Sequence, residues 1–301
     1  MNDLAKYNQY IDLEWWRGIS KRSIKSWIGN FENEQTALEI LDKIIFYNKA
    51  QMNKYTECLI DQLKDRIFLQ ELKEGGLRCV DDSLLNKRWM EYLSITKVVP
   101  AKLKKDVACS ADQVIGYWRS ELGEDVLSDI LNIADHLQSG IQRFLLVDDF
   151  AGTGKQMSDV LSRPLVIDGQ EICLGNIPKH FPGVEIMVAC YVIHEEAYRR
   201  LRKDYPEAEL LFVDRIGTEM SYLCPDSHLY DAKPKEEAER LKQEIKKLED
   251  KLHEEEKYKN IKEYSLNIPI VFEHGCPNNT LLLLFAKTVT WHQLFRRGEE
   301  K

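Results

Sequence analysis

Residues 144–156, with the sequence FLLVDDFAGTGKQ, carry the strongest signals for both the fold and the chemistry of this chain. The first four residues are a continuous apolar run, which is typical of a short strand buried on both faces of a sheet. Asp148 and Asp149 follow this run directly. Burying carboxylates without partners is unfavourable, so the pair predicts a bound ligand at the end of the strand.

The residues after the acid pair predict a phosphate-binding loop that leads into a helix. Ala151-Gly152-Thr153-Gly154 has small side chains, which let backbone N–H groups approach a ligand closely. A helix that starts near Lys155 would add unsatisfied N–H donors and partial positive charge, which suit a phosphate. An acid pair beside such a loop predicts a ligand with both hydroxyls and a phosphate, such as a ribose 5-phosphate group.

Gly154-Lys155 raises a competing interpretation, the nucleotide-binding P-loop G-x-x-x-x-G-K-[ST]. That pattern requires Gly at position 149 and Ser or Thr at position 156, where this chain has Asp149 and Gln156. An aspartate inside the loop would also repel the phosphates. The dinucleotide-binding pattern G-x-G-x-x-G is absent as well, so neither nucleotide motif explains the segment.

Apolar runs further along the chain extend the strand pattern of the segment. Residues 184–192 and 210–213 are two more expected strands, and helical patterns at 155–161 and 194–203 lie between the three strands. Short apolar strands alternating with helices predict an α/β fold with a mostly parallel sheet covered on both faces. Asp168-Gly169 between two short apolar runs predicts a hairpin outside that sheet.

Two predominantly helical regions accompany this core. Residues 1–76 have apolar side chains at helical spacing and are expected to form an N-terminal helical region, with 77–301 as the α/β core. Residues 225–262 are rich in Lys and Glu and are expected to be a helical insertion in that core. The insertion has a heptad-like apolar seam of Ala238, Leu241, Ile245, Leu248 and Leu252.

The seam leaves two interpretations open for residues 235–257. One is a solvated helix that packs on its own domain. The other is a coiled-coil contact with a protein partner or with a second copy of the chain, although about three heptads are marginal for an independent coiled coil.

Composition narrows the classes of partner. The chain has 301 residues and 44% hydrophobic residues, which is enough for a sizeable core. Its 42 basic and 50 acidic residues give a net charge of −8, the opposite of what a protein that coats nucleic acid needs. A nucleic-acid partner is therefore possible but not indicated, and the basic run at 199–203 is expected to be a solvated helix face, with contact to RNA or DNA as the alternative.

No apolar run approaches the ~20 residues that a membrane-spanning helix needs, so no membrane partner is expected. The N-terminus lacks the apolar stretch and cleavage site of a signal peptide. The seven cysteines are scattered, without a C-x-x-C pair. These features predict a cytoplasmic protein with reduced cysteines.

Residues 144–156 resemble the phosphoribosyl diphosphate (PRPP) motif of type I phosphoribosyltransferases: an apolar strand, two acids, two variable residues and a Thr/Ser-Gly loop. The resemblance implies that Asp148 and Asp149 are the catalytic acids beside the ribose hydroxyls. It also implies a 5-phosphate loop formed by Ala151, Gly152, Thr153, Gly154, Lys155 and Gln156. Thr153 matches the usual hydroxyl donor. Gln156 replaces the usual terminal Thr, so one hydroxyl contact to the phosphate becomes an amide contact or is lost.

More specifically, the chain resembles the phosphoribosyltransferase-like proteins of bacterial conflict and antiphage systems. Outside the central motif, the resemblance is carried by WIGNF at 27–31, PNNT at 277–280 and a Trp followed by a basic ending at 291–297. It implies a PRPP-dependent glycosyltransferase (a pentosyltransferase) in antiviral defence or a toxin system. Mg²⁺ is then expected to be carried by PRPP, with no protein metal ligand assigned directly.

Other parts of the expected pocket are less defined by sequence. The best candidate for a diphosphate-binding loop is 107–111, with Ser110 and the downstream Arg119 as contacts, and a plain turn into a helix is the alternative. His274, Asn278 and Asn279 are further pocket candidates, and each also suits a structural turn or cap. Without a clear diphosphate loop, a second hypothesis stays open: a non-catalytic module that senses PRPP or a nucleotide and regulates a partner. No residue predicts the acceptor.

Overall fold

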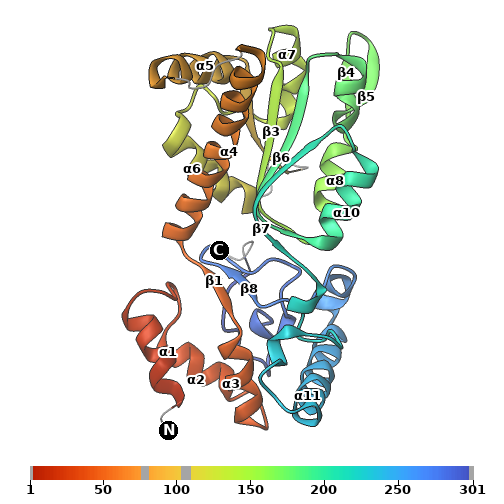
Figure 1. Cartoon of the computed structure of the whole chain (residues 1–301). Coiled ribbons are helices and arrows are strands. Elements are labelled where there is room, and N and C mark those ends of the chain that lie inside the picture. The colour runs from red at the N-terminus through yellow and green to blue at the C-terminus, as the bar shows by residue number, and fades with distance from the viewer. Residues whose placement is uncertain (1–2, 76–80, 103–109, 298–301) are drawn as a thin grey trace. The chain divides into compact units, whose positions relative to one another are not determined.

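The computed structural model describes residues 3–75, 81–102 and 110–297, and the chain divides into two compact units (Figure 1). The sheet unit is Met52–Arg215, and the terminal unit combines Met1–Gln51 with Ile216–Lys301. These boundaries differ from the expected division into 1–76 and 77–301. The reason is that helix α4 (Lys49–Gly75) packs on the sheet from Met52 onward, instead of joining the N-terminal helices.

The sheet unit contains a four-stranded sheet in the order β2-β3-β6-β7, which confirms the predicted α/β class with a parallel sheet. Its strands are β2 (Thr96–Pro100), β3 (Arg143–Ala151), β6 (Glu185–His194) and β7 (Glu209–Ile216). The central strand β3 pairs in parallel with β2 on one side and with β6 on the other. We call the edge where these parallel strands end the carboxyl edge, and the opposite edge the amino edge.

Helices cover both faces of this sheet (Figure 1). On one face, Phe144 and Leu146 of β3 pack in a core with Met157 and Leu201 from two helices. On the other face, Tyr191 of β6 shares a 2.7 Å hydrogen bond with Thr56 of α4. The first face is covered by α7 (Ile133–Gln138), α8 (Lys155–Leu161) and α10 (Glu195–Asp204), and the second by α4, α5 (Asp82–Ser94) and α6 (Ser110–Leu122). Successive side chains of a strand point to opposite faces of the sheet, and helices bury both faces. This explains why the strands read as continuous apolar runs.

The predicted hairpin is confirmed as the antiparallel pair β4 (Pro164–Ile167) and β5 (Gln170–Cys173). Its two turn residues, Asp168 and Gly169, have φ of 50° and 77°, as the Asp-Gly sequence predicts. The remaining short helices of the sheet unit are η1 (Ile130–Asn132), η2 (Leu174–Asn176) and α9 (Ile177–His180).

The terminal unit joins the two ends of the chain through a parallel pair of short strands, β1 (Ile45–Tyr47) and β8 (Ile270–Phe272). The sequence did not predict strand β1 within the helical N-terminal region; it forms because residues 45–47 find a strand partner more than 220 positions away. The helices are α1 (Asp3–Asp12), α2 (Lys21–Ile28), α3 (Glu34–Asp42) and α11 (Lys235–His253), with short helices η3 (Thr218–Met220), η4 (His228–Tyr230), η5 (Glu256–Glu263) and η6 (Leu282–Leu284).

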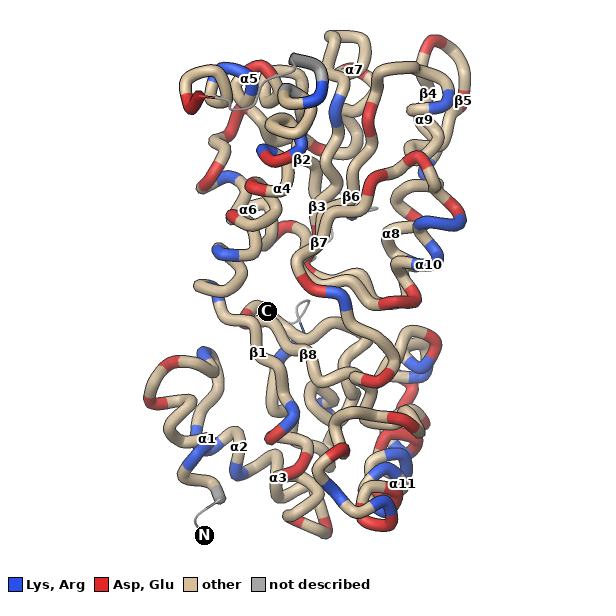
Figure 2. The backbone as a smooth tube through the Cα atoms, in the orientation of Figure 1, with Lys and Arg blue, Asp and Glu red and all other residues tan. Residues whose placement is uncertain are grey.

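Helix α11 forms most of the expected charged insertion, and Lys, Arg, Asp and Glu alternate along it (Figure 2). Its apolar seam faces the core of the terminal unit, where Leu241 and Ile245 are almost fully buried. A helix packed on its own unit therefore accounts for the seam without a coiled-coil partner. Among the residues that the structure describes, no helix is both long and apolar enough to cross a bilayer.

Candidate functional site

The acid pair lies at the carboxyl edge of the sheet unit, on its central strand. Asp148 and Asp149 are only 3% and 4% exposed. The strand was expected to end at Val147, but β3 continues to Ala151 because Phe150 and Ala151 still pair with Val192 and Ile193 of β6. The two carboxylates are therefore held by the sheet itself, and the loop begins only after them.

Three neutral donors hold the carboxylate of Asp148. The hydroxyl of Ser110, the first residue of α6, donates to its Oδ1 at 2.9 Å, and the backbone N–H of Asp149 donates to the same oxygen at 3.0 Å. The side-chain amide of Gln156, in the first turn of α8, donates to Oδ2 at 3.0 Å. The carboxylate of Asp149 accepts the backbone N–H of Phe150 at 2.8 Å. Residues of β3, α6 and α8 thus hold the predicted acid pair together through hydrogen bonds.

The electrostatics of the pair favour a cationic ligand. Burial raises the pKa of Asp148 well above its ordinary value, and the neighbouring charge of Asp149 raises it further. The hydrogen bonds from Ser110 and from the amide of Asp149 act in the opposite direction. Burial and the two carboxylates also raise the pKa of the Cys190 thiol, which pairs with Asp148 across the sheet. A cation or hydroxyl donor at this position would relieve the cost of the buried charge.

The loop after the acids is packed tightly against the start of α10. The carbonyl oxygen of Gly152 accepts the backbone N–H of Ala197 at 3.1 Å. Gly154 has a φ of 73°, and a Cβ at this position would lie 2.9 Å from the Cα of Ala197. Both its backbone conformation and its close approach to α10 therefore require glycine. Thr153 accepts the N–H of Lys155 on its Oγ1 at 3.4 Å and is partly exposed, and Lys155 itself is exposed.

Gln156 differs from the other members of the predicted loop, because its amide faces the acid pair. The Nε2 atom donates to Asp148 and also to the carbonyl oxygen of Ala101, at 3.3 Å, just after the end of β2. Ala101 is itself fixed to β3, since its N–H donates to the carbonyl of Val147 at 3.0 Å. Sequence reasoning included Gln156 but missed Ala101, whose contribution comes from its backbone and leaves no sequence signal.

Of the two candidates for the diphosphate region, the structure brings only Ser110 to the acid pair. Residues 107–109 of the proposed loop lie outside the described residues. Arg119 is in the last turn of α6, nine residues from Ser110, and thus about 13 Å further along the helix at ~1.5 Å per residue. Its Nε lies 2.7 Å from the Oε1 of Glu124.

A cation that sequence reasoning missed also lies at this edge. Lys102 follows β2, and its mostly buried side chain forms an ion pair with Asp112, two residues into α6. The signal that could have found it is its position directly after the apolar residues 98–101. Within residues 3–75, 81–102 and 110–297, no group of three or more His, Cys, Asp and Glu is arranged to hold a metal ion.

His274, Asn278 and Asn279 lie in the terminal unit, in a different compact unit from the acid pair. The ring of His274 stacks on Phe272 with a centroid distance of 5.5 Å. Asn279 donates its side-chain N–H to the carbonyl of Tyr264, and its own carbonyl accepts the N–H of Leu266 at 3.1 Å. These contacts give His274 and Asn279 structural partners inside their own unit.

Two outer segments of the family resemblance, 27–31 and 291–297, meet in the core of the terminal unit. The indole N–H groups of Trp27 and Trp291 both donate to the carbonyl of Leu283, at 2.7 and 3.1 Å. Phe31 packs edge-on between them, with its centroid 5.3 Å from that of Trp291. The aromatic residues of these segments therefore build a core. Trp15, by contrast, is 54% exposed.

An acid pair and a glycine loop lie at the carboxyl edge of a parallel sheet, which is the edge where open α/β sheets generally bind their ligands. Residues 24–297 match the family PRTase-CE, which is a phosphoribosyltransferase-type family. The chain therefore belongs to the PRTase-CE family. A search of curated proteins finds no match to the chain.

Proposed function

We propose that the sheet unit binds PRPP with Mg²⁺ at the end of β3 and transfers the phosphoribosyl group to an acceptor. The observation that carries this proposal is the buried pair Asp148-Asp149 directly before a loop that only glycine can complete at position 154. Membership of a phosphoribosyltransferase-type family supports it from an independent direction.

In this proposal the ribose lies against the two carboxylates, and its 5-phosphate lies against the backbone of residues 151–155. The acceptor forms a bond to C1 of the ribose while the C1–O bond to diphosphate breaks, and the bonding electrons leave with the diphosphate. Positive character develops on the ribose during this exchange. Asp148 and Asp149 stabilise it because they are preorganised negative groups in a site largely shielded from water.

The residues present suit Mg²⁺ in one respect: the buried acid pair supplies negative charge that a cation would stabilise. Mg²⁺ is commonly bound through substrate phosphates with only one or two carboxylates from the protein. Mg²⁺ would therefore arrive with PRPP, and Asp148 and Asp149 would face the metal-bearing end of the ribose. The metal would neutralise charge on the departing diphosphate.

The biological setting of the proposal is a bacterial antiphage or toxin system, in which the chain acts as an effector. The support for this setting is the resemblance of the segments at 27–31, 148–154, 277–280 and 291–297 to proteins of such systems. A cytoplasmic location stays a prediction from sequence.

Calorimetric titration of the full chain with PRPP, with and without Mg²⁺, tests the proposal. We expect Mg²⁺-dependent binding by the wild type and none by Asp148→Asn/Asp149→Asn. Release of diphosphate is then measured with nucleobases and nucleic acids as acceptors. Binding that depends on the aspartates without diphosphate release would favour a PRPP sensor over a transferase. No binding by the folded wild type would overturn the proposed ligand.

A further inference from the structure

The side-chain amide of Gln156 can donate two hydrogen bonds, and both donors have a partner in the structure. A glutamine amide nitrogen carries two hydrogens. The Nε2 atom of Gln156 faces two acceptors, Asp148 Oδ2 at 3.0 Å and the Ala101 carbonyl oxygen at 3.3 Å. Because both partners are acceptors, the nitrogen and not the oxygen of the amide must face them. Only the carbonyl oxygen of the amide is left, and it cannot donate to a phosphate.

We infer that Gln156 is a positioning residue that fixes the carboxylate of Asp148 for the ribose hydroxyls, and that it is not a ligand of the 5-phosphate. The inference rests on the proposed function, since it names the part of the ligand that Gln156 serves. It separates Gln156 from the preceding loop residues 151–155, which keep the phosphate role.

Ser110 and Gln156 together form a clamp on the carboxylate of Asp148, and its geometry explains why a long amide side chain is needed at position 156. Ser110 holds one oxygen of Asp148 from the start of α6, and Gln156 holds the other from the first turn of α8. The same amide reaches Ala101, which is tied to β3 next to the acids. A threonine at 156 is two atoms shorter and has one O–H donor, so it cannot bridge Asp148 and Ala101. With Gln156 in place, rotation of the Asp148 carboxylate would break hydrogen bonds at both of its oxygens.

The contact itself is tested without any ligand, by a double-mutant cycle on thermal unfolding of the full chain. Gln156→Glu sets two carboxylates against each other, and Asp148→Asn turns one acceptor of Asp148 into a donor. In Asp148→Asn/Gln156→Glu the donor and acceptor are exchanged, so we expect a smaller loss in Tm than the sum of the two single losses. Asp159→Asn, on the exposed side of α8, replaces Asp148→Asn in the control cycle. Additive losses in both cycles would show that the clamp does not exist.

The role toward ribose is tested by the preference for ribose 5-phosphate over 2-deoxyribose 5-phosphate in calorimetric titrations. A hydrogen bond to a charged group predicts a wild-type preference of about tenfold or more. We expect this ratio to fall towards one in Gln156→Leu and in Gln156→Thr, while affinity for inorganic phosphate is unchanged. Equal weakening of both sugar phosphates and of inorganic phosphate would overturn the inference and make Gln156 a phosphate ligand.

The two measurements distinguish failure of the inference from failure of the proposed function. A folded wild type that binds neither Mg²⁺–PRPP nor the two sugar phosphates contradicts the proposed function and the ribose role together, whether or not Gln156 and Asp148 are coupled. A wild type that binds ribose 5-phosphate with an unchanged sugar preference in the Gln156 variants contradicts the inference alone.

Discussion

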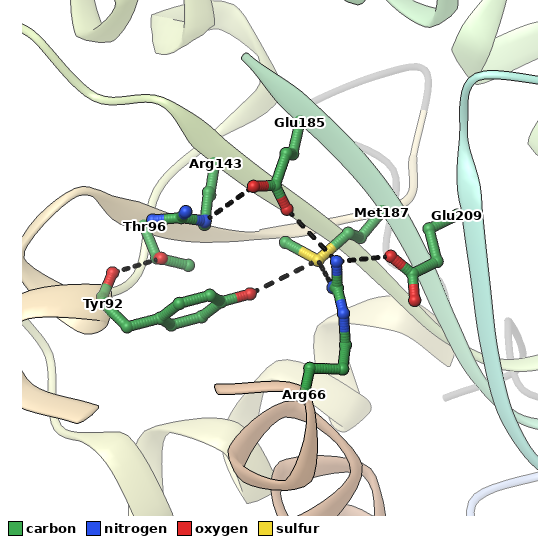
Figure 3. A network of polar contacts seen from close by, with 7 residues as sticks. All are labelled: Arg66, Tyr92, Thr96, Arg143, Glu185, Met187 and Glu209. Atoms are coloured by element: carbon green, nitrogen blue, oxygen red, sulfur yellow. Dashed lines mark hydrogen bonds and ion pairs between the residues drawn. The ribbon is translucent and has the colours of Figure 1, made fainter. Parts of the chain in front are cut away.

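Asp148 at the carboxyl edge of the sheet and the glutamates at its amino edge have different kinds of partner. At the amino edge, Arg66 lies 2.7 Å from Glu209 and 3.4 Å from Glu185, and Arg143 lies 3.1 Å from Glu185 (Figure 3). At the carboxyl edge, the carboxylate of Asp148 accepts from a hydroxyl and two amides, all of them neutral. The amino edge pairs acids with guanidinium groups, whereas Asp148 is held by dipoles.

This difference separates a structural cluster of ion pairs from the proposed ligand site. The amino-edge network links α4 to three strands, and Arg143 also lies 4.4 Å over the ring of Tyr92 from α5. Its charges are already matched. Neutral donors orient a carboxylate without cancelling its charge, so the charge of ionised Asp148 stays available for a cation or a developing positive centre.

Neutralising two acids at each edge gives the largest expected contrast. Asp148→Asn/Asp149→Asn should lower affinity for Mg²⁺–PRPP by more than about 100-fold, because two charge-assisted contacts are lost. Glu185→Gln/Glu209→Gln makes the same change in net charge at the amino edge. It should leave the affinity within about twofold and lower the Tm instead, since Arg66 and Arg143 lose their partners. Calorimetric titration with Mg²⁺–PRPP and thermal unfolding of the wild type and the two double variants check both. Equal loss of affinity in the two double variants would reduce the effect to net charge.

Glycine substitutions at the two edges give a smaller, purely steric contrast. Gly154 and Gly183 both have positive φ, 73° and 93°. A Cβ at Gly183 meets nothing within 4 Å, whereas one at Gly154 would press on the backbone of Ala197. Gly183→Ala should cost about 1 kcal/mol and leave PRPP binding intact. Gly154→Ala should cost about 2–3 kcal/mol and weaken binding, because α10 or the loop must move. Denaturant unfolding measures both costs, and equal costs would contradict the packing of the loop on α10.

Local features of the sheet unit were predictable from sequence because local patterns determine them. The helical pattern at 155–161 matches α8, and the Asp168-Gly169 turn appears as expected. The acid pair and Ser110 could be named from residue type and spacing. Their mutual contact could not, since Ser110 is 38 positions from Asp148 and meets it only when α6 packs on the sheet.

Non-local features escaped sequence reasoning. Strand β1 was missed because residues 45–47 become a strand only by pairing with 270–272. The role of Ala101 was missed because it depends on a backbone carbonyl that every residue possesses. The contact of Phe31 with Trp291 could not be predicted either, because it forms only when the two ends of the chain pack together. In each case the deciding partner lies far away along the chain.

The proposed ligand site should also differ from the amino edge in the pH dependence of ligand binding, which we expect Asp148 to determine. Its pKa is raised above the ordinary 3.8, mainly by burial and then by Asp149. A carboxyl group with a raised pKa stabilises the free fold at low pH, and that contribution is lost as pH rises through the raised pKa. Mg²⁺–PRPP favours the ionised form, so affinity should rise over the same window by at most about tenfold per pH unit.

Calorimetric titrations in buffers of different ionisation enthalpy check this. Below the raised pKa of Asp148, this carboxyl group should release at most one proton for each PRPP bound. Asp149→Asn removes the second cause of the shift and should move the pH-dependent window to lower pH. Affinity that is independent of pH across this window would show that Asp148 does not change its protonation state on binding.

The smallest expected effect comes from a single residue of the amino edge. Arg66 contacts Glu185, Glu209 and the sulfur of Met187, so Arg66→Ala removes a tie between α4 and two strands. The side chain is 36% exposed, which limits the expected loss to about 1 kcal/mol, or roughly 2–4 °C in Tm.

Lys54→Ala is the control. Lys54 lies on the same helix, is highly exposed and, among the described contacts, pairs only with its near neighbour Glu57. Its Tm should be unchanged. Both variants should bind Mg²⁺–PRPP like the wild type. A weaker affinity in Arg66→Ala with an unchanged Tm would mean that the amino edge affects ligand binding. It would contradict the assignment of a structural role to the amino edge and of ligand binding to the carboxyl edge.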